Sequence, residues 1–234
     1  MAVTDFITVR DLGRMPYEPV FKAMKTFTKK RSPDTPDEIW LLEHEPVFTL
    51  GQAADRSHLL DPHDIPVFQA DRGGEVTYHA PGQAVAYLLI DLKRRTKNRL
   101  FVREFVRQIE QAVIDTLAVY HLSGERRAGA PGIYLGLDAV PQSWQGAKIA
   151  ALGLKVLRNG CTYHGLSLNV SMDLQPFSWI NPCGYAGLVS SDMKMTGRNV
   201  SVSEVQHELA HALCRQMQAQ LDFKGNRLPS VMAA

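Results

Sequence analysis

Apolar residues recur at helical spacing in three stretches of the chain, residues 16–31, 99–120 and 201–221. Residues at i and i+4 lie on one face of a helix, so each stretch is predicted to pack one face on a core. In the third stretch Ser201 and Glu204 stand in capping-box register, which is typical of a helix start. The rows expected to face the core are Phe105, Ile109, Val113 and Leu117 in the second stretch and Val205, Leu209, Leu213, Met217 and Leu221 in the third.

Shorter runs of β-branched and aromatic residues, bounded by glycine and proline, predict strands between these helices. Strands and helices do not alternate regularly, which favours an α+β fold with a central mixed or antiparallel sheet flanked by helices. No repeat, low-complexity segment or long linker divides the chain, so we expect residues 1–234 to form a single domain. The predicted strand regions are 6–13, 38–51, 65–92, 132–136, 147–160 and 161–170.

The overall composition is that of a globular protein, with 45% hydrophobic and 21% charged residues among 234. No apolar run is long enough to span a bilayer, and the N-terminus carries Asp5 and lacks a continuous apolar h-region. We therefore expect neither membrane association nor secretion. The three cysteines are widely spaced and odd in number, which suits a reducing compartment and predicts a cytoplasmic protein.

The net charge of +2 is too small for a dedicated nucleic-acid binder, so no nucleic-acid partner is expected. Basic residues nevertheless cluster in residues 29–31 and 93–99. A solvated surface is the simpler interpretation of each cluster. The alternative is a docking patch for an acidic protein, and reversing the charges of Lys93, Arg94 and Arg95 would then weaken the use of that partner.

The third helical stretch contains the sequence HELAH, with His207 and His211 four residues apart around a glutamate, as on the helix of a zinc peptidase. A catalytic zinc needs a third protein ligand, usually a histidine six residues on or a later glutamate. Met217 occupies that histidine position, and no His or Glu follows His211. We interpret the two histidines as surface residues and expect no metal site.

Cys183 differs from the other two cysteines in its surroundings. Cys161 and Cys214 lie within strand and helix patterns and are expected to be buried as small hydrophobes. Cys183 stands between a proline and a glycine in the segment INPCGYAG, where backbone amides can point at a bound oxygen. From this segment alone it is either a chance loop cysteine or a nucleophile.

Two further segments contain candidate functional residues. In RGGEVTYHAPGQ (residues 72–83), two glycines allow close approach to the backbone, and Tyr78 and His79 add polar groups. In GAKIAALG (residues 146–153), Lys148 is the only charged residue among small and apolar neighbours. Taken separately, the first could be an ordinary turn, and the lysine could simply extend its ammonium group to the surface.

Taken together and in this order, these segments resemble the motifs of the lipoyl(octanoyl) transferase family. The matching motifs, spaced over about half the chain, are RGGEVTYHAPGQ, KIAALG and HGLSLNVSMDLQPFSWINPCG. The resemblance implies a fold related to lipoate and biotin protein ligases. It makes Cys183 the nucleophile that carries the acyl group as a thioester and Lys148 the residue that lowers the pKa of its thiol. It also implies that the walls of the acyl pocket are formed by Arg72, Gly73, Gly74, Glu75, Val76, Thr77, Tyr78, His79, Ala151, Leu152, Gly153, Gly165, Leu166 and Ser167.

The reaction implied by this resemblance moves an octanoyl group from octanoyl-acyl carrier protein to a lysine of a lipoyl domain, the first step of endogenous lipoate synthesis. The implied recipients are lipoyl domains of 2-oxoacid dehydrogenase complexes and the glycine cleavage H protein. We expect a monomer without cofactor, and the sequence contains neither a GxxxxGK[ST] loop nor a GxGxxG fingerprint. Backbone amides of Leu152, Gly153 and Gly184 are expected to stabilise the oxyanion, and His79 to position the thiol.

Two other classes of protein fit part of this pattern. An ATP-dependent lipoate or biotin ligase would share the fold and activate a free acid as an adenylate. A catalytically silent acyl-binding or carrier-binding module would hold octanoyl groups without covalent transfer. Dependence of acyl transfer on Cys183 discriminates both from the transferase.

Overall fold

The computed structural model describes residues 5–96, 101–136 and 141–229, with only the backbone described at Cys183. Within these residues an eight-stranded sheet runs in the order β11-β1-β2-β6-β10-β9-β8-β7. β1 is parallel to both of its neighbours, and the other adjacent pairs are antiparallel, so the predicted mixed sheet is confirmed. Its strands are β1 (Phe6–Met15), β2 (Asp37–His44), β6 (Gln83–Leu89), β7 (Gly124–Arg127), β8 (Ala130–Leu135), β9 (Lys148–Val156), β10 (Thr162–Asn169) and β11 (Gln220–Phe223).

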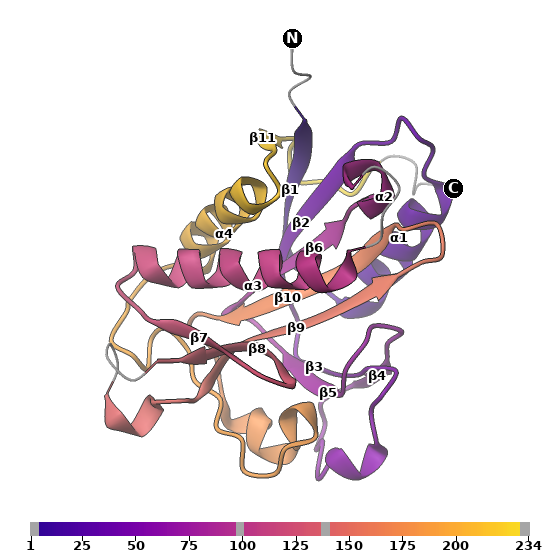
Figure 1. Ribbon diagram of the computed structural model, residues 1–234. Helices are drawn as coiled ribbons and strands as arrows, with labels where there is room; N and C mark the ends of the chain where they lie inside the picture. The colour runs from indigo at the N-terminus through magenta and orange to yellow at the C-terminus, as the bar shows by residue number, and fades with distance from the viewer. Residues whose placement is uncertain (1–4, 97–100, 137–140, 230–234) are drawn as a thin grey trace.

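Helices cover both faces of this sheet. α3 (Val102–Val119) and α4 (Val202–Gln216) lie side by side across one face, and α1 (Tyr17–Lys30) lies on the other, as Figure 1 shows. The expected rows on α3 and α4 are buried, apart from the last two positions of the α4 row. Burial of these apolar faces is the main force that holds helices to sheet. No helix in the described ranges is long and apolar enough to cross a membrane.

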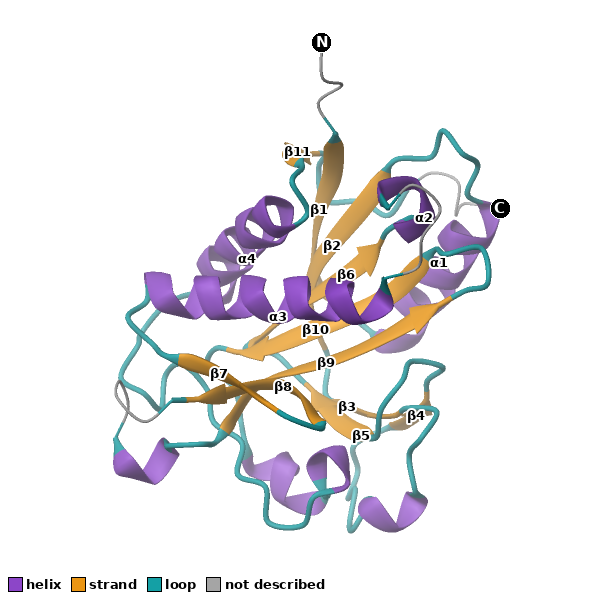
Figure 2. Cartoon of the chain, viewed as in Figure 1, coloured by secondary structure: helices purple, strands orange, loops and turns teal. Residues whose placement is uncertain are grey.

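A second, three-stranded sheet lies beside the main one and supports the cavity described below (Figure 2). It contains β4 (Val67–Gln69), β3 (Val47–Leu50) and β5 (Val76–His79), with β3 in the middle. The predicted strand region 38–51 is therefore two strands in two sheets, because the chain turns at Pro46 between them. Short helical turns complete the fold, namely α2 (Leu92–Arg95) and the 3₁₀ turns Arg56–His58, Gln142–Trp144, Gln175–Trp179 and Pro182–Gly184.

The C-terminal helix is shorter than predicted. α4 ends at Gln216, and Gln218 adopts a left-handed backbone with φ 53°. The chain then pairs as β11, parallel to β1, and the first two residues of this strand, Gln220 and Leu221, were predicted to be helical. No glycine marks this helix end, and the i, i+4 apolar row continues past it to Leu221, so the sequence lacks the usual signal for the end of a helix.

Two arginines of the basic cluster at 93–99 are bound to a buried carboxylate. Arg94 and Arg95 pair with Asp37 at 2.7 and 2.6 Å, and Arg31 of the other basic cluster adds a third contact at 2.6 Å. The Asp37 side chain is only 1% exposed. Reversing Arg94 and Arg95 would break this network, so that substitution cannot test partner docking. Residues 97–99 lie outside the described residues.

We expect Asp37→Asn to lower the free energy of unfolding by about 3–5 kcal/mol, because it leaves three guanidinium groups without their buried counter-charge. Urea denaturation of the purified variant measures this loss. The matched control is Glu18→Gln, which breaks an exposed pair with Lys22 on α1 and should change stability by less than about 0.5 kcal/mol. Equal effects of the two substitutions would contradict a structural role for Asp37.

Candidate active site

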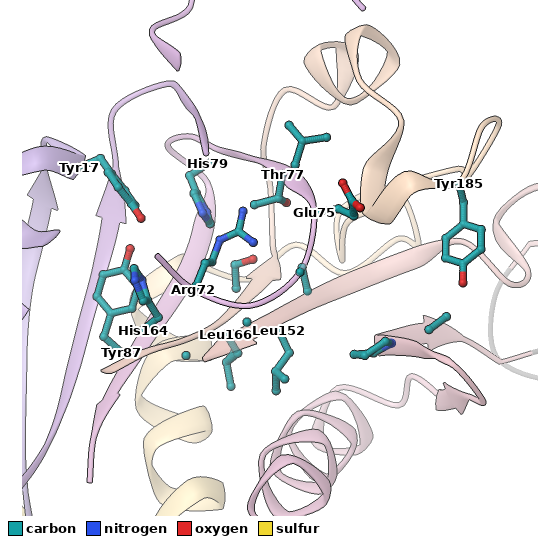
Figure 3. Close-up of a pocket in the computed structure, with 18 of the residues that line it drawn as sticks. Tyr17, Arg72, Glu75, Thr77, His79, Tyr87, Leu152, His164, Leu166 and Tyr185 are labelled. Carbon is teal, nitrogen blue, oxygen red and sulfur yellow. The ribbon is translucent and has the colours of Figure 1, made fainter. Parts of the chain in front are cut away.

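A cavity of about 200 Å³ lies between β9, β10 and the loop that leads into β5. Figure 3 shows its lining, with Leu152 and Leu166 on one side and polar groups around them. All of the residues expected in the acyl pocket line this cavity except Gly73 and Tyr78. The lining also includes seven residues that were not expected in the pocket wall, although two of them, His164 and Tyr185, stand in the quoted motifs. The seven are Tyr17, Tyr87, Gly129, Ala130, Pro131, His164 and Tyr185.

Sheet geometry explains why the residues of β9 and β10 reach the cavity together. Ala151, Leu152 and Gly153 pair with Ser167, Leu166 and Gly165 in antiparallel register. The pairing of β8 with β9 ends at Ala150. Residues 151–153 therefore form a stretch of β9 that borders the cavity where β8 no longer covers it.

Arg72 fixes the loop that forms the opposite wall. Its Nη2 donates to the carbonyl and hydroxyl oxygens of Thr49 at 2.7 and 2.9 Å, and its Nη1 donates to the Gly73 carbonyl at 3.0 Å. The Gly73 amide donates to the Leu154 carbonyl at 2.9 Å, so this glycine allows the loop to pack on β9 and does not border the cavity. Tyr78 points to the other face of β5, where its ring contacts Phe48.

Buried rings from four elements line one end of the cavity, namely Tyr17 of α1, His79 of β5, Tyr87 of β6 and His164 of β10, as the left of Figure 3 shows. His44 of β2 packs against Tyr17, His79 and Tyr87. The ring of Tyr17 stacks parallel to that of His79 at 6.1 Å. His44 Nδ1 donates to the Met15 carbonyl at 2.8 Å, so its Nε2 accepts the Tyr87 hydroxyl at 2.7 Å. This end is thus a rigid aromatic and imidazole cluster.

The histidines of this cluster are held neutral. Burial lowers the pKa of His79 to about 3 and that of His44 to about 4. Burial also lowers the pKa of His164, although the hydrogen bond to Asp71 at 3.0 Å opposes the shift. Asp71 has a pKa well below its usual range, because hydrogen bonds from His164, Tyr163 and Lys25 outweigh the effect of burial.

These shifts predict a stability that falls in mild acid. The unfolded chain binds a proton at each histidine near pH 6.5 while the folded state does not, so stability is full above that pH and is lost as the pH falls toward the folded pKa values. For His44 and His79 together the loss from pH 7.5 to pH 5.5 is about 3 kcal/mol. Urea denaturation at the two pH values measures it. A protein equally or more stable at pH 5.5 would contradict the neutral, buried state of these imidazoles.

Lys148 begins β9 and is 4% exposed. Its Nζ donates to the Pro131 carbonyl at 2.8 Å and lies 5.4 Å from the centre of the Tyr134 ring. Gly132 makes this position possible, because a Cβ atom there would lie 2.7 Å from Lys148 Cε, and its φ of 123° also favours glycine. The lysine is therefore enclosed beneath β8 and does not extend its ammonium group into solvent.

The segment that contains Cys183 returns to Lys148. The Lys148 amide donates to the Val189 carbonyl at 2.8 Å, and the Ser191 amide donates to the Lys148 carbonyl at 2.9 Å. A small second cavity is lined by both Lys148 and Pro182, the residue before Cys183, and it shares Thr77, Ala151 and Ser167 with the acyl cavity. The side chain of Cys183 itself lies outside the described set.

Gly184 and His79, for which the sequence predicts roles in oxyanion binding and thiol positioning, both donate hydrogen bonds within the protein. The Gly184 amide donates to the Asn181 carbonyl at 3.0 Å, so in this conformation it is not available to an oxyanion. The His79 Nδ1 donates to Gln83 Oε1 at 2.7 Å, and Gln83 in turn donates to Asn169. This network fixes the imidazole of His79 in the cavity wall.

The remaining candidates lie away from the cavity. His207 and His211 are exposed on α4, as predicted, and both contact Phe223 of β11. Cys161 and Cys214 are buried, as predicted, and burial raises the pKa of each thiol, to about 11 for Cys214.

Comparison with known proteins places this chain in a family. The model of the lipoyl protein ligase A/B catalytic domain matches residues 16–214. The chain is 60% identical over 210 residues to an octanoyltransferase of Herminiimonas arsenicoxydans, covering 89% of this chain and 95% of that protein. It is 58% identical over 214 residues to an octanoyltransferase of a Janthinobacterium species, strain Marseille, covering 91% and 97%.

The fold is that of lipoate protein ligases. A structure of the bipartite lipoate protein ligase of Thermoplasma acidophilum superimposes with a TM-score of 0.75, over 99% of this chain and 90% of that one, at 14% identity. At that identity the likeness concerns the fold alone, and it agrees with the predicted ligase-like α+β architecture. By the extent and identity of the sequence matches, the chain belongs to the octanoyltransferase family and is an acyltransferase built on the lipoyl protein ligase A/B catalytic domain.

Proposed function

We propose that this protein transfers an octanoyl group from octanoyl-acyl carrier protein to a lysine of lipoyl domains through a thioester on Cys183. The observation that supports this best is the return of the Cys183 segment to Lys148 beside an acyl-sized cavity. The proposed partners are the carrier protein, lipoyl domains of 2-oxoacid dehydrogenase complexes and the glycine cleavage H protein. The protein is proposed to act as a cytoplasmic monomer.

The proposed reaction has two half-reactions. In the first, the Cys183 thiolate attacks the thioester carbonyl, the bond to the carrier sulfur breaks, and the carrier leaves as a thiol after taking up a proton. In the second, the amine of the target lysine attacks the acyl-enzyme, the Cys183 thiolate leaves, and the nitrogen loses its proton. The first exchange is nearly isoenergetic and the second forms an amide from a thioester, so the sequence needs no ATP.

Lys148 is proposed to promote the formation of the thiolate. A free cysteine has a pKa of about 8.5, so only a few per cent is ionised at neutral pH. An ammonium group beside the sulfur favours the charged form of the thiol and lowers its pKa. Two observations support this role: the Lys148 side chain is buried, and it lines the same small cavity as Pro182.

The acyl chain is proposed to lie in the cavity between the Arg72 loop and strands β9 and β10. Burial of each methylene contributes about 0.8 kcal/mol, so chains shorter than octanoyl lose affinity stepwise. The backbone amide of Leu152 remains the proposed oxyanion donor. The Leu154 carbonyl accepts from Gly73, so strand alternation turns the Gly153 amide toward its partner Gly165 on β10. Gly153 and Gly184 would each have to give up a backbone bond to join Leu152.

The transferase and the ligase alternative differ in whether the reaction requires a nucleotide. Purified protein, an apo lipoyl domain and octanoyl-carrier protein should give a modified domain without nucleotide. A reaction that instead requires free octanoate and ATP would replace the transferase proposal by the ligase. Retention of full activity in Cys183→Ser would also replace the transferase proposal by the ligase.

A further inference from the structure

The end of the acyl cavity contains two buried polar atoms without a hydrogen-bond partner in the described structure. They are Tyr17 Oη and His164 Nδ1. Tyr17 is 5% exposed and His164 is 1% exposed, and both line the cavity. Buried polar groups in proteins are nearly always paired, so such atoms call for an explanation. An octanoyl chain offers no polar group that could pair with them.

His164 is held in its position by an unusual backbone. It is not a glycine, yet its φ is 61°, in the left-handed region. Side chains of successive strand residues normally point to opposite faces, but the rings of Tyr163 and His164 are stacked at 5.0 Å. The strained backbone thus brings the imidazole to the same side as Tyr163. Strain of this kind persists where the surrounding structure enforces it, often at functional sites.

The chemistry of the two atoms is complementary. His164 Nε2 donates to Asp71 Oδ1 at 3.0 Å, and burial keeps the imidazole neutral, so Nδ1 is a hydrogen-bond acceptor. Burial raises the pKa of Tyr17, so its hydroxyl stays protonated and can donate. Figure 3 shows Tyr17, Tyr87 and His164 grouped at the end of the cavity away from Tyr185. A ligand hydroxyl can donate to His164 Nδ1 and accept from Tyr17 Oη.

These atoms lie at the far end from the proposed thioester. Ser167 borders both the acyl cavity and the small cavity with Lys148, and His164 is three residues away along β10. At about 3.3 Å per residue this separation is roughly 10 Å. An extended octanoyl group, with C–C bonds of about 1.5 Å, is roughly 9 Å long. A chain attached near Ser167 therefore extends as far as His164 with its last carbon, and Tyr17 lies at the same end of the cavity (Figure 3).

We propose that Tyr17 and His164 form a polar subsite that accepts medium-chain acyl groups carrying a hydroxyl at the far end of the chain. This inference deepens the proposed function and rests on it. It extends the substrate class from plain octanoyl to ω-hydroxyacyl groups of the same length. An apolar pocket floor would discriminate against the added hydroxyl, because it would bury that hydroxyl without a partner.

The test compares octanoyl with 7-hydroxyheptanoyl, in which a hydroxyl replaces the last methyl group. Both are supplied in competition on acyl carrier protein, and mass spectrometry of the digested lipoyl domain gives the ratio of their kcat/KM values. We expect the wild-type protein to use the hydroxyacyl group at least as well as octanoyl. Tyr17→Phe should shift the ratio toward octanoyl by about tenfold, a loss typical of one hydrogen bond.

Tyr163→Phe is the matched control, because its hydroxyl donates to Asp71 and its side chain does not line the cavity. It should leave the ratio within about twofold. Rejection of the hydroxyacyl group by wild-type protein on the order of 100-fold, as an apolar floor would give, overturns the inference. So does an unchanged ratio in Tyr17→Phe. Failure of the proposed function itself gives a different result, because the lipoyl domain then stays unmodified with either acyl-carrier protein.

Discussion

Cys183→Ala is expected to lower the rate of octanoyl transfer to a lipoyl domain on the order of 10⁴-fold or more. The proposed reaction passes through a bond to the Cys183 sulfur, and removal of a nucleophile leaves only the contributions of binding and oxyanion stabilisation. The rate is measured with octanoyl-carrier protein and an apo lipoyl domain, by the mass of the modified domain over time. Because Cys183 lies in a 3₁₀ turn and not in a core helix or strand, the variant should remain folded.

Cys161→Ala and Cys214→Ala provide matched controls for this loss. Both thiols are buried in the core, and burial raises the pKa of each, so neither is suited to act as a nucleophile. We expect each variant to keep activity within about threefold of wild type while losing on the order of 1 kcal/mol of stability through the cavity created. Loss of activity in either control equal to that of Cys183→Ala would show that the assay reports folding and not chemistry.

Lys148→Met is expected to lower kcat on the order of 10² to 10⁴-fold, the usual contribution of a positioned acid or base. Methionine preserves much of the length of the buried chain but removes the charge and the bond to the Pro131 carbonyl. The deficit should shrink as the pH is raised toward the pKa of a free thiol, because hydroxide then supplies the thiolate. Initial rates of acyl-enzyme formation between pH 7 and pH 9.5 measure both effects.

The control for this substitution lies on the same strand. Lys155 is near the other end of β9, where its Nζ donates to Gln52 Oε1 at 3.1 Å, and it does not line the acyl cavity. Lys155→Met should leave kcat within about threefold of wild type. A Lys148→Met protein that is folded and reacts at the wild-type rate would remove Lys148 from the proposed mechanism.

The main features of the fold could be predicted from the sequence where periodicity was strong. The i, i+4 rows of α3 and α4 are long, and their buried faces contact the sheet as expected. β11 was missed because it is only four residues long and follows a helix that ends at Gln216. The left-handed residue after that helix is Gln218, and glutamine has no intrinsic preference for stopping a helix. β7 has the sequence GERR, which lacks the apolar alternation of a half-buried strand.

The cavity was predictable only in part, because motifs describe neighbours in sequence. The segments 72–79, 151–153 and 165–167 could be grouped through a family resemblance, yet Tyr17 comes from α1 and Tyr87 from β6. Nothing local to these tyrosines distinguishes a cavity wall from an ordinary core. His164 begins the recognised segment HGLSLNV but was not among the expected wall residues, because its side chain turns to that side only through its left-handed backbone, which no sequence pattern indicated.

The basic clusters show the opposite limitation, because arginines that suggest a docking surface proved to bind a buried carboxylate. Consecutive arginines at 94 and 95 suggest a charged surface, because sequence gives no sign of a distant carboxylate. Asp37, which lies 57 and 58 positions earlier, binds both and is almost fully buried. Charge clusters therefore need the fold before they can be interpreted as docking sites.

The intact mass of the protein after incubation with octanoyl-acyl carrier protein shows whether Cys183 carries the octanoyl group as a thioester. A thioester on Cys183 should give one octanoyl adduct on wild-type protein and none on Cys183→Ala. When an apo lipoyl domain is added, the adduct should disappear and an octanoylated domain should appear. An adduct that persists in Cys183→Ala, or a domain that is modified at the wild-type rate while no adduct ever forms, would contradict the acyl-enzyme mechanism.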